Sequence, residues 1–371
     1  MTYKIAQVHP HFGPSELKEV ASSLEAAWVT EGPKSSAFVG EMLRMTGAKY
    51  GVLAPNGTLS LYMALMVLGI HKGDEVIVPD FTMIASSNAV YLTGAKPVFV
   101  DVSKEDLTII PELIEKRITP RTRAIMPVHI YGHAADMGAI MKIAKKHDLF
   151  IVEDACQGVG LRYKGKHGGT FGEFGCFSFF ADKIITTGGE GGMVVTNNAK
   201  LYEELRYFRN QGRLTSGTFI HPRIGYNFRM TDLQCAVGLA QIRQYDKILA
   251  KRLRNCSLYE KQLEGITQIQ IIKPKSYSNF VPFRFNMFAE RAAELMKFLE
   301  QNGIQTRGMF YPLHQQPCYM MYSYDDRDFP NTIFAYEHGL SLPVYYDLKT
   351  SDISYICNTI QKFYESSTRR R

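Results

Sequence analysis

The sequence predicts an α/β fold in which a large domain with a mostly parallel, mixed sheet is followed by a smaller C-terminal α+β domain. Up to about residue 245, short apolar runs alternate with helical patterns. Strands that are apolar on both faces are typical of sheets covered by helices on both sides, hence of mostly parallel pairing. The chain has 371 residues, enough for two cores. We expect the large domain over residues 1–245 and the small one over 246–371.

The first expected element is a helix over residues 14–28, with Ser15 at its start after Pro14. Its apolar side chains recur at helical spacing and share one face: Leu17, Val20, Ala21, Leu24 and Trp28. A second helix over 56–70 is opened by Asn56 and Gly57. The next expected elements are strands at 74–81, 96–102, 123–132 and 149–155 and helices at 111–118 and 137–147.

The C-terminal part of the chain has a different pattern. A long charged helix over 246–265 leads into the segments 282–288 and 292–304 and then into a helix near 353–364. This order is typical of an α+β domain joined to the first domain through the long helix.

Composition narrows the class of function. The formal net charge is +7, without long basic runs, although three arginines end the chain in an expected disordered tail. This modest surplus suits a small anionic substrate and does not favour nucleic acid. The six cysteines form no C-x-x-C pair, so we expect free thiols and no metal site. No signal peptide or membrane helix is expected, which favours a cytoplasmic protein.

Candidate functional residues lie where predicted strands end. Asp154 ends an apolar strand, where a carboxylate needs a cationic partner such as a protonated pyridine nitrogen. Lys183 follows an aromatic strand and precedes several glycines, a setting in which a partly desolvated amine could react with an aldehyde. Taken singly, a salt bridge for Asp154 and an exposed lysine at 183 are the simpler interpretations.

A phosphate site completes the pattern. Asn56, Gly57 and Thr58 open a helix, whose first N–H groups bind anions, and Ser178 stands five residues before Lys183. A phosphate, a protonated ring and an aldehyde together describe one cofactor, pyridoxal 5'-phosphate.

Long motifs then identify a family. The segments VEDACQ, FGCFSFFADKIITTGGEGGMVVTN, IGYNFRMTDLQCAVGLAQ and YPLH resemble the DegT/DnrJ/EryC1/StrS family of sugar aminotransferases. The resemblance spans nearly the whole chain. It implies the pyridoxal-phosphate-dependent transferase fold type I, as in aspartate aminotransferase.

The resemblance implies a role for each matching residue. Lys183 matches the lysine that links to the cofactor aldehyde, and Asp154 matches the partner of the pyridine nitrogen. Gln157 matches a side chain near the ring hydroxyl. The phosphate contacts match Gly57, Thr58 and Ser178, with Asn227 reaching the phosphate from the neighbouring subunit of a homodimer with shared active sites.

This sequence departs from the family pattern at two places. Met83 stands where an aromatic ring usually stacks on the cofactor, and the glycine-rich loop at 188–192 has one extra glycine. His129, Arg229 and His314 are candidate substrate contacts, and a structural role is the alternative for each. Arg307 is a further candidate for binding phosphate oxygens.

The implied reaction moves an amino group from L-glutamate to a nucleotide-linked keto-deoxy sugar. GDP-4-keto-6-deoxymannose is the favoured acceptor. Alternatives are a dTDP- or UDP-linked 3- or 4-keto sugar, an 8-oxo octulosonate, a sugar dehydratase and a non-catalytic regulator that binds the cofactor. The family's dehydratases carry histidine in place of the lysine, so Lys183 favours transamination.

Overall fold

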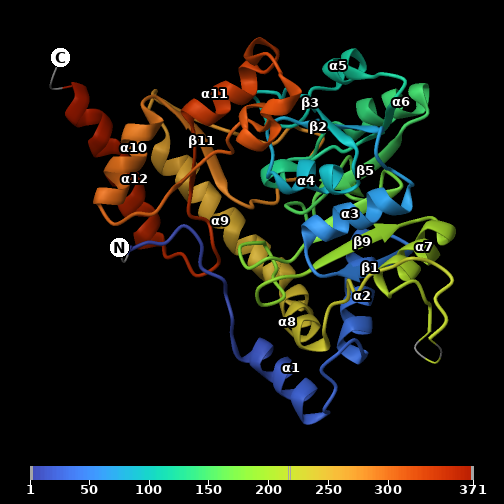
Figure 1. Ribbon diagram of the computed structural model, residues 1–371. Coiled ribbons are helices and arrows are strands. Elements are labelled where there is room, and N and C mark those ends of the chain that lie inside the picture. The colour runs from blue at the N-terminus through green and yellow to red at the C-terminus, as the bar shows by residue number, and fades with distance from the viewer. Residues whose placement is uncertain (1–2, 216, 218, 369–371) are drawn as a thin grey trace.

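The computed structural model describes residues 3–215, 217 and 219–368. The three arginines of the expected tail, residues 369–371, lie outside this part of the chain. Two groups of elements lie on either side of the long helix α9 (Tyr245–Leu263), each with its own sheet (Figure 1).

The larger group contains a seven-stranded sheet in the order β1-β9-β8-β5-β4-β2-β3. Neighbouring strands are parallel from β8 through β5, β4 and β2 to β3, whereas β9 runs antiparallel to both β8 and β1. The predicted mostly parallel, mixed sheet is therefore confirmed. The strands are β1 (Tyr50–Ala54), β2 (Glu75–Pro79), β3 (Lys96–Val100), β4 (Thr122–Ile125), β5 (Phe150–Asp154), β8 (Phe174–Ser178) and β9 (Gly192–Thr196).

Helices cover both faces of this sheet, which explains its continuous apolar strands. One apolar cluster includes side chains of α2, α6 and α8, and another includes side chains of α3, α4 and α7. The helices of this part are α1 (Pro14–Glu25), α2 (Pro33–Thr46), α3 (Gly57–Val67), α4 (Ala85–Leu92), α5 (Pro111–Ile114), α6 (Met137–His147), α7 (Ala199–Arg209) and α8 (Asp232–Arg243). A small hairpin joins β6 (Arg162–Tyr163) to β7 (Lys166–His167).

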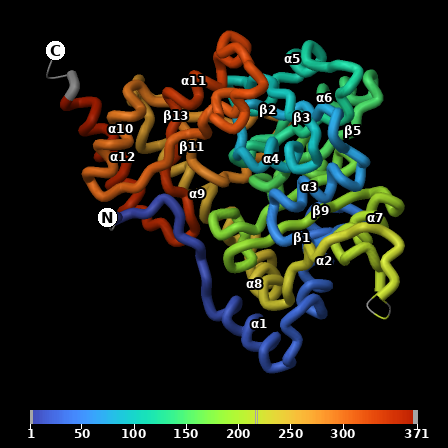
Figure 2. Tube along the Cα trace, in the orientation of Figure 1, coloured from blue at the N-terminus to red at the C-terminus, as the bar shows by residue number. Residues whose placement is uncertain are grey.

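The smaller group contains a four-stranded antiparallel sheet in the order β10-β11-β13-β12. Figure 2 shows the N-terminal segment beside this group, and Ile5 pairs with Ile304 and joins its apolar core. The elements are β10 (Ile269–Ile271), β11 (Phe285–Ala289), α10 (Ala292–Gln301), β12 (Arg307–Gly308), α11 (Pro330–His338), β13 (Gly339–Leu342) and α12 (Thr350–Thr368). The domain division at residue 245 stays a prediction, with the start of α9 close to it.

Helix α1 forms where it is expected, but with the opposite face buried. It begins at Pro14, with Gly13 and not Ser15 as the residue before it, and the Gly13 N–H donates to Glu16. Glu16 is buried and accepts a 2.7 Å hydrogen bond from Gln241 of α8. Leu17 remains 73% exposed. Polar contacts thus dock α1 onto α8, and its apolar face is free in the single chain.

Several predicted elements are shorter than expected, and the difference is most informative in the segments 123–132 and 111–118. The strand predicted over 123–132 ends at Ile125, and residues 130–132 form a 3-10 turn. Pro127 has no N–H to donate to a neighbouring strand, which favours this early end. The helix predicted over 111–118 is α-helical only over Pro111–Ile114. Among the described residues, none of the helices combines the length and apolar character needed to cross a membrane.

Candidate active site

A cavity of about 350 Å³ lies between the two sheets. Strands β5 and β8 end at its wall with Asp154 and Ser178, as expected for a ligand site at the carboxyl ends of parallel strands. The small sheet supplies the facing wall. The lining residues that matter here are Gly57, Thr58, Met83, Asp154, Gln157, Ser178, Asp182, Lys183, Glu190, Phe283, Arg284, Arg307 and Phe310.

Asp154 is 5% exposed and is held by two hydrogen bonds from within the chain. Ser86 Oγ donates to its Oδ2 at 2.7 Å, and the backbone N–H of Cys156 donates to its Oδ1 at 3.1 Å. Each carboxylate oxygen can accept a second bond. Asp154 is therefore fixed in orientation and retains capacity for a cationic ligand group.

Gly57 and Ser178 form a narrow cradle at the start of α3. A Cβ added at Gly57 would lie 2.8 Å from the Cys156 sulfur and 2.9 Å from the Ser178 Cβ, so only glycine fits. Asn56 caps the helix by accepting the Leu59 N–H at 2.9 Å. The first N–H groups of a helix have no intrahelical partner, so this cradle suits a phosphate.

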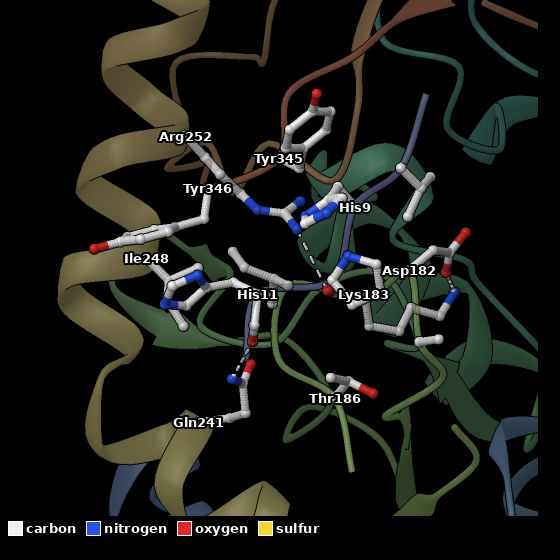
Figure 3. Close-up of a pocket in the computed structure, with 14 residues that line it drawn as sticks. His9, His11, Asp182, Lys183, Thr186, Gln241, Ile248, Arg252, Tyr345 and Tyr346 are labelled. Atoms are coloured by element: carbon white, nitrogen blue, oxygen red, sulfur yellow. Dashed lines mark hydrogen bonds and ion pairs between the residues drawn. The ribbon is translucent and has the colours of Figure 1, made fainter. Parts of the chain in front are cut away.

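Lys183 lies in the loop after β8, with its side chain 14% exposed. Its Nζ is 3.9 Å from Asp182 Oδ1 and 4.6 Å from the centre of the Phe283 ring. Figure 3 shows a second, small cavity behind it, where Arg252 of α9 is directed at the Lys183 backbone and donates to its carbonyl. Lys183 therefore lines both cavities.

Two further predicted contacts line the larger cavity. Gln157 accepts the Tyr131 N–H through Oε1 at 2.8 Å, which leaves its Nε2 as the group that can donate to a ligand. Met83 is half-exposed at the cavity. Phe81 is fully buried against the rings of Tyr131 and Phe310, so it does not replace the aromatic ring missing at 83.

The glycine-rich loop contributes Glu190 to the lining. Burial raises the pKa of Glu190, and the charge of Lys183 opposes this effect. A Cβ added at Gly189 would meet nothing within 4 Å, whereas Gly188 has a φ of +97° and needs glycine. The loop therefore does not need Gly189 for steric reasons.

Asn227 and Arg229 do not line the cavity of their own chain. Asn227 accepts a 2.9 Å hydrogen bond from Arg229 Nε, and Arg229 lines a separate surface hollow of about 610 Å³. This placement leaves both side chains available to a neighbouring molecule.

His129 and His314 are also absent from the cavity. His129 is fully buried, contacts Glu153 through Nε2 at 3.1 Å, and accepts the Ala135 N–H through Nδ1. His314 contacts Asp80 at 2.6 Å and Asp326 at 3.1 Å. Because both nitrogens of each ring are engaged within the chain, these contacts favour the structural role that is the alternative for each histidine, and substrate contact stays a prediction.

Sequence reasoning missed the contribution of residues that precede β11. Phe283 and Arg284 line the cavity opposite Asp154, and Arg284 Nη2 contacts Asp182 Oδ2 at 2.8 Å. The segment PFRF gave one signal, an arginine between two aromatic residues at the start of the segment 282–288. Because this segment is far from Lys183 in the sequence, no local pattern indicated the contact.

The chain matches the model of the DegT/DnrJ/EryC1/StrS aminotransferase family over residues 10–361. The chain belongs to this family. The aminotransferase class predicted from the sequence is thereby confirmed, as is the fold.

Individual members of the DegT/DnrJ/EryC1/StrS family agree closely with the chain. It is 38% identical to the GDP-perosamine synthase of Escherichia coli O157:H7 over 357 residues, covering 96% of this chain and 97% of that protein. The structure of S. venezuelae DesV matches with a TM-score of 0.89 and 34% identity over 94% of each chain. The PLP form of the sugar aminotransferase Spr1654 of Streptococcus pneumoniae matches with a TM-score of 0.93 and 26% identity, covering 98% and 99% of the two chains.

Proposed function

We propose that the protein is a pyridoxal-phosphate-dependent aminotransferase that takes its amino group from L-glutamate. The favoured acceptor is GDP-4-keto-6-deoxymannose, which would yield GDP-perosamine. The observation that carries the proposal is the convergence of Lys183, Asp154 and the Gly57–Ser178 cradle on one cavity. A cytoplasmic location stays a prediction.

The chemistry of the cavity fits this cofactor. The space left by the missing Cβ of Gly57, next to the start of α3, suits its phosphate. On the wall beyond the cradle, the Asp154 carboxylate would hold the ring nitrogen and Gln157 Nε2 would donate to the ring oxygen. Lys183 is the one lysine among the residues that line the cavity, so its amine would bind the aldehyde.

When bound, pyridoxal phosphate supplies an electron-withdrawing ring that stabilises negative charge on the carbon beside the transferred nitrogen. Asp154 would stabilise the protonated nitrogen of this ring, and its fixed orientation means that little reorganisation would be needed during the reaction. The Lys183 amine, when it is not bonded to the aldehyde, would accept the proton from the donor Cα as a general base.

The small-sheet wall completes the site. Phe283 and Phe310 provide apolar surface that limits water, and Phe283 lies against the Lys183 side chain. Asp154 and Lys183 thus have different environments. One is a carboxylate in which each oxygen is anchored by one hydrogen bond within the chain, and the other is an amine with an aromatic ring beside it.

Borohydride reduction followed by peptide mass mapping tests the assignment of Lys183. We expect the reduced cofactor on Lys183 alone, and we expect the Lys183→Ala variant to fold but to lose transamination. A label on another side chain, or a variant with the wild-type rate, would contradict the proposal.

A panel of keto sugars tests the acceptor. The protein would first be loaded with pyridoxamine phosphate and then offered GDP-4-keto-6-deoxymannose, dTDP- and UDP-linked 3- and 4-keto sugars, and an 8-oxo octulosonate. We expect the GDP sugar to react with the largest kcat/KM. The sequence similarity to a GDP-perosamine synthase supports this order, and a faster reaction with another sugar would replace the acceptor and leave the chemistry in place.

We also propose that two copies share their active sites. Three observations support a second copy: the exposed apolar face of α1, the hollow lined by Arg229, and the exposed side chains Phe219, Ile220 and Ile224. Asn227 would then reach the partner's phosphate site. Mixing inactive Lys183→Ala and Asn227→Ala subunits would restore part of the activity in mixed dimers, and no restoration would contradict sharing.

A further inference from the structure

Three cations surround one carboxylate at the small-sheet end of the cavity. Asp182 Oδ2 is 2.8 Å from Arg284 Nη2 and 3.9 Å from Arg307 Nη1, and Asp182 Oδ1 is 3.9 Å from Lys183 Nζ. Arg284 precedes β11 and Arg307 begins β12, so the tertiary structure brings them to the lysine loop. Without counting Lys183, the guanidinium groups of Arg284 and Arg307 still share the single negative charge of Asp182.

The two guanidinium groups repel each other. Burial lowers the pKa of Arg284, the neighbouring charge of Arg307 lowers it further, and Asp182 opposes both effects. The Arg284 side chain is 7% exposed, whereas that of Arg307 is 56% exposed. Within the described residues, Nη1 of Arg284 has no hydrogen-bond partner. Like charges held this close are unfavourable unless an anion joins them.

Asp182 supplies one negative charge between the two guanidinium groups, and the other carboxylates of the cavity lining do not add a second. Glu190, another carboxylate of the cavity lining, is exposed on the glycine-rich loop. Asp154 lies on the opposite wall, where it accepts hydrogen bonds from Ser86 and the Cys156 N–H. Behind the cluster, buried Arg252 adds another positive charge. It donates to the carbonyls of Pro282, Phe283 and Lys183, and no carboxylate of the described residues lies within salt-bridge distance of it.

We propose that Arg307, together with Arg284 held in place by Asp182, binds the anionic oxygens of both substrates in turn. This inference rests on the proposed function, since two substrates that alternate in one site need a shared point of recognition. The shared chemistry is an anionic oxygen group: a carboxylate of the amino donor in one half-reaction and the phosphate oxygens of the nucleotide sugar in the other. Arg307 is the accessible group, and Asp182 is a positioning residue that orients Arg284.

The first test separates the two sources of the anion. Arg307→Gln would be compared with wild type in two half-reactions, with glutamate and with the nucleotide keto sugar. A charge-assisted hydrogen bond supports an increase of about 10- to 100-fold in KM for each substrate that uses the site. An increase for one substrate alone would contradict recognition of both substrates by this site. Arg327→Gln is the matched control, because Arg327 is exposed and pairs with Asp325 on the same turn.

The second test measures binding without turnover. The full-length protein would be titrated with 2-oxoglutarate and with GDP, using the rise in Tm as the readout. We expect wild type to be stabilised by both probes, and Arg307→Gln to need about tenfold more of each for the same rise. An Arg307→Gln variant that matches wild type in both half-reactions and both titrations would overturn the inference.

The direction of the change in Tm distinguishes a ligand-binding role of Arg307 from a structural one. Without ligand, Arg307→Gln should raise Tm by about 1–3 °C because it removes repulsion, whereas Asp182→Asn should lower it because it removes the shared counter-charge. A merely structural Arg307 would lower Tm when replaced. If wild type binds the probes through Arg307 yet shows no transamination, the proposed function fails and this inference stands.

Discussion

The two walls of the cavity are stabilised by different kinds of interaction. On the seven-stranded-sheet wall, Asp154, Gln157 and the Gly57–Ser178 cradle are fixed by hydrogen bonds and close packing within the chain. On the small-sheet wall, Arg284 and Arg307 are held near each other with one carboxylate between them. The side chains of the first wall are held by partners within the chain, whereas the second wall retains positive charge that Asp182 alone does not balance.

This difference indicates what each wall does. A cofactor that stays in place through many turnovers is best held by a rigid, satisfied site, where reorganisation is small. Substrates that enter and leave in turn are better recognised by groups whose unfavourable charge is relieved on binding. The comparison can therefore be tested by changing each wall and asking whether cofactor binding or substrate binding responds.

The largest effect is expected at the sheet wall, from Asp154→Asn. The variant keeps one oxygen for a hydrogen bond from the chain but loses the negative charge that faces the ring nitrogen. We expect the rate of the glutamate half-reaction to fall by about 100-fold or more, measured by stopped-flow absorbance. A rate within threefold of wild type, with the cofactor bound, would show that this wall does not act through charge.

A smaller effect is expected when the cradle is filled. Gly57→Ala places a Cβ 2.8 Å from the Cys156 sulfur and 2.9 Å from the Ser178 Cβ. Overpacking of about 1–3 kcal/mol corresponds to a loss of about 10- to 100-fold in cofactor affinity, measured by equilibrium dialysis. Gly189→Ala is the matched control, since its Cβ meets nothing within 4 Å and should leave affinity unchanged. Equal losses in the two variants would refute the steric cradle.

The smallest effect is expected at His314, which supports the end of β2. Burial alone would lower the pKa of His314, but the hydrogen bonds and charges of Asp80 and Asp326 outweigh it and raise the pKa. The folded state therefore holds the proton more tightly than the unfolded state. Its stabilising contribution is complete below the unfolded pKa of about 6.5 and is lost as the pH rises through the raised pKa.

His314→Gln provides the comparison for this effect. In wild type we expect Tm to fall by about 2–4 °C as the pH rises from below 6.5 through the raised pKa, and we expect the variant to lack this component. Differential scanning calorimetry at a series of pH values measures it. Identical pH profiles for the two proteins would show that the Asp80–His314–Asp326 contacts do not carry the pH dependence.

The cofactor wall was predictable because its residues belong to local patterns. Asp154 and Ser178 end apolar strands, and Asn56 and Gly57 open a helix, so each is recognised from its own neighbours in sequence. Parallel pairing then places strand ends at one edge, which brings these residues together without further information. Lys183 follows the same logic, five residues after Ser178.

Other features depended on contacts that no local pattern records. The apolar spacing of α1 correctly predicted a helix, yet Glu16 and not Leu17 is buried, because α8 offers Gln241 to a carboxylate. The histidines at 129 and 314 stand in motifs near the site, yet buried carboxylates hold both rings in the interior.

The sequence by itself determined the alternation of strands and helices, the strand-end carboxylate and the position of Lys183 in the loop after a strand, since periodicity and helix capping act over a few residues. Only the tertiary structure decided which side chains face Lys183 from the small sheet. Arg284 and Arg307 are 102 and 125 residues from Asp182 along the chain, as the numbering gives by subtraction. Coulomb forces between them depend on distance in space, and the packing of the two sheets across α9 sets that distance.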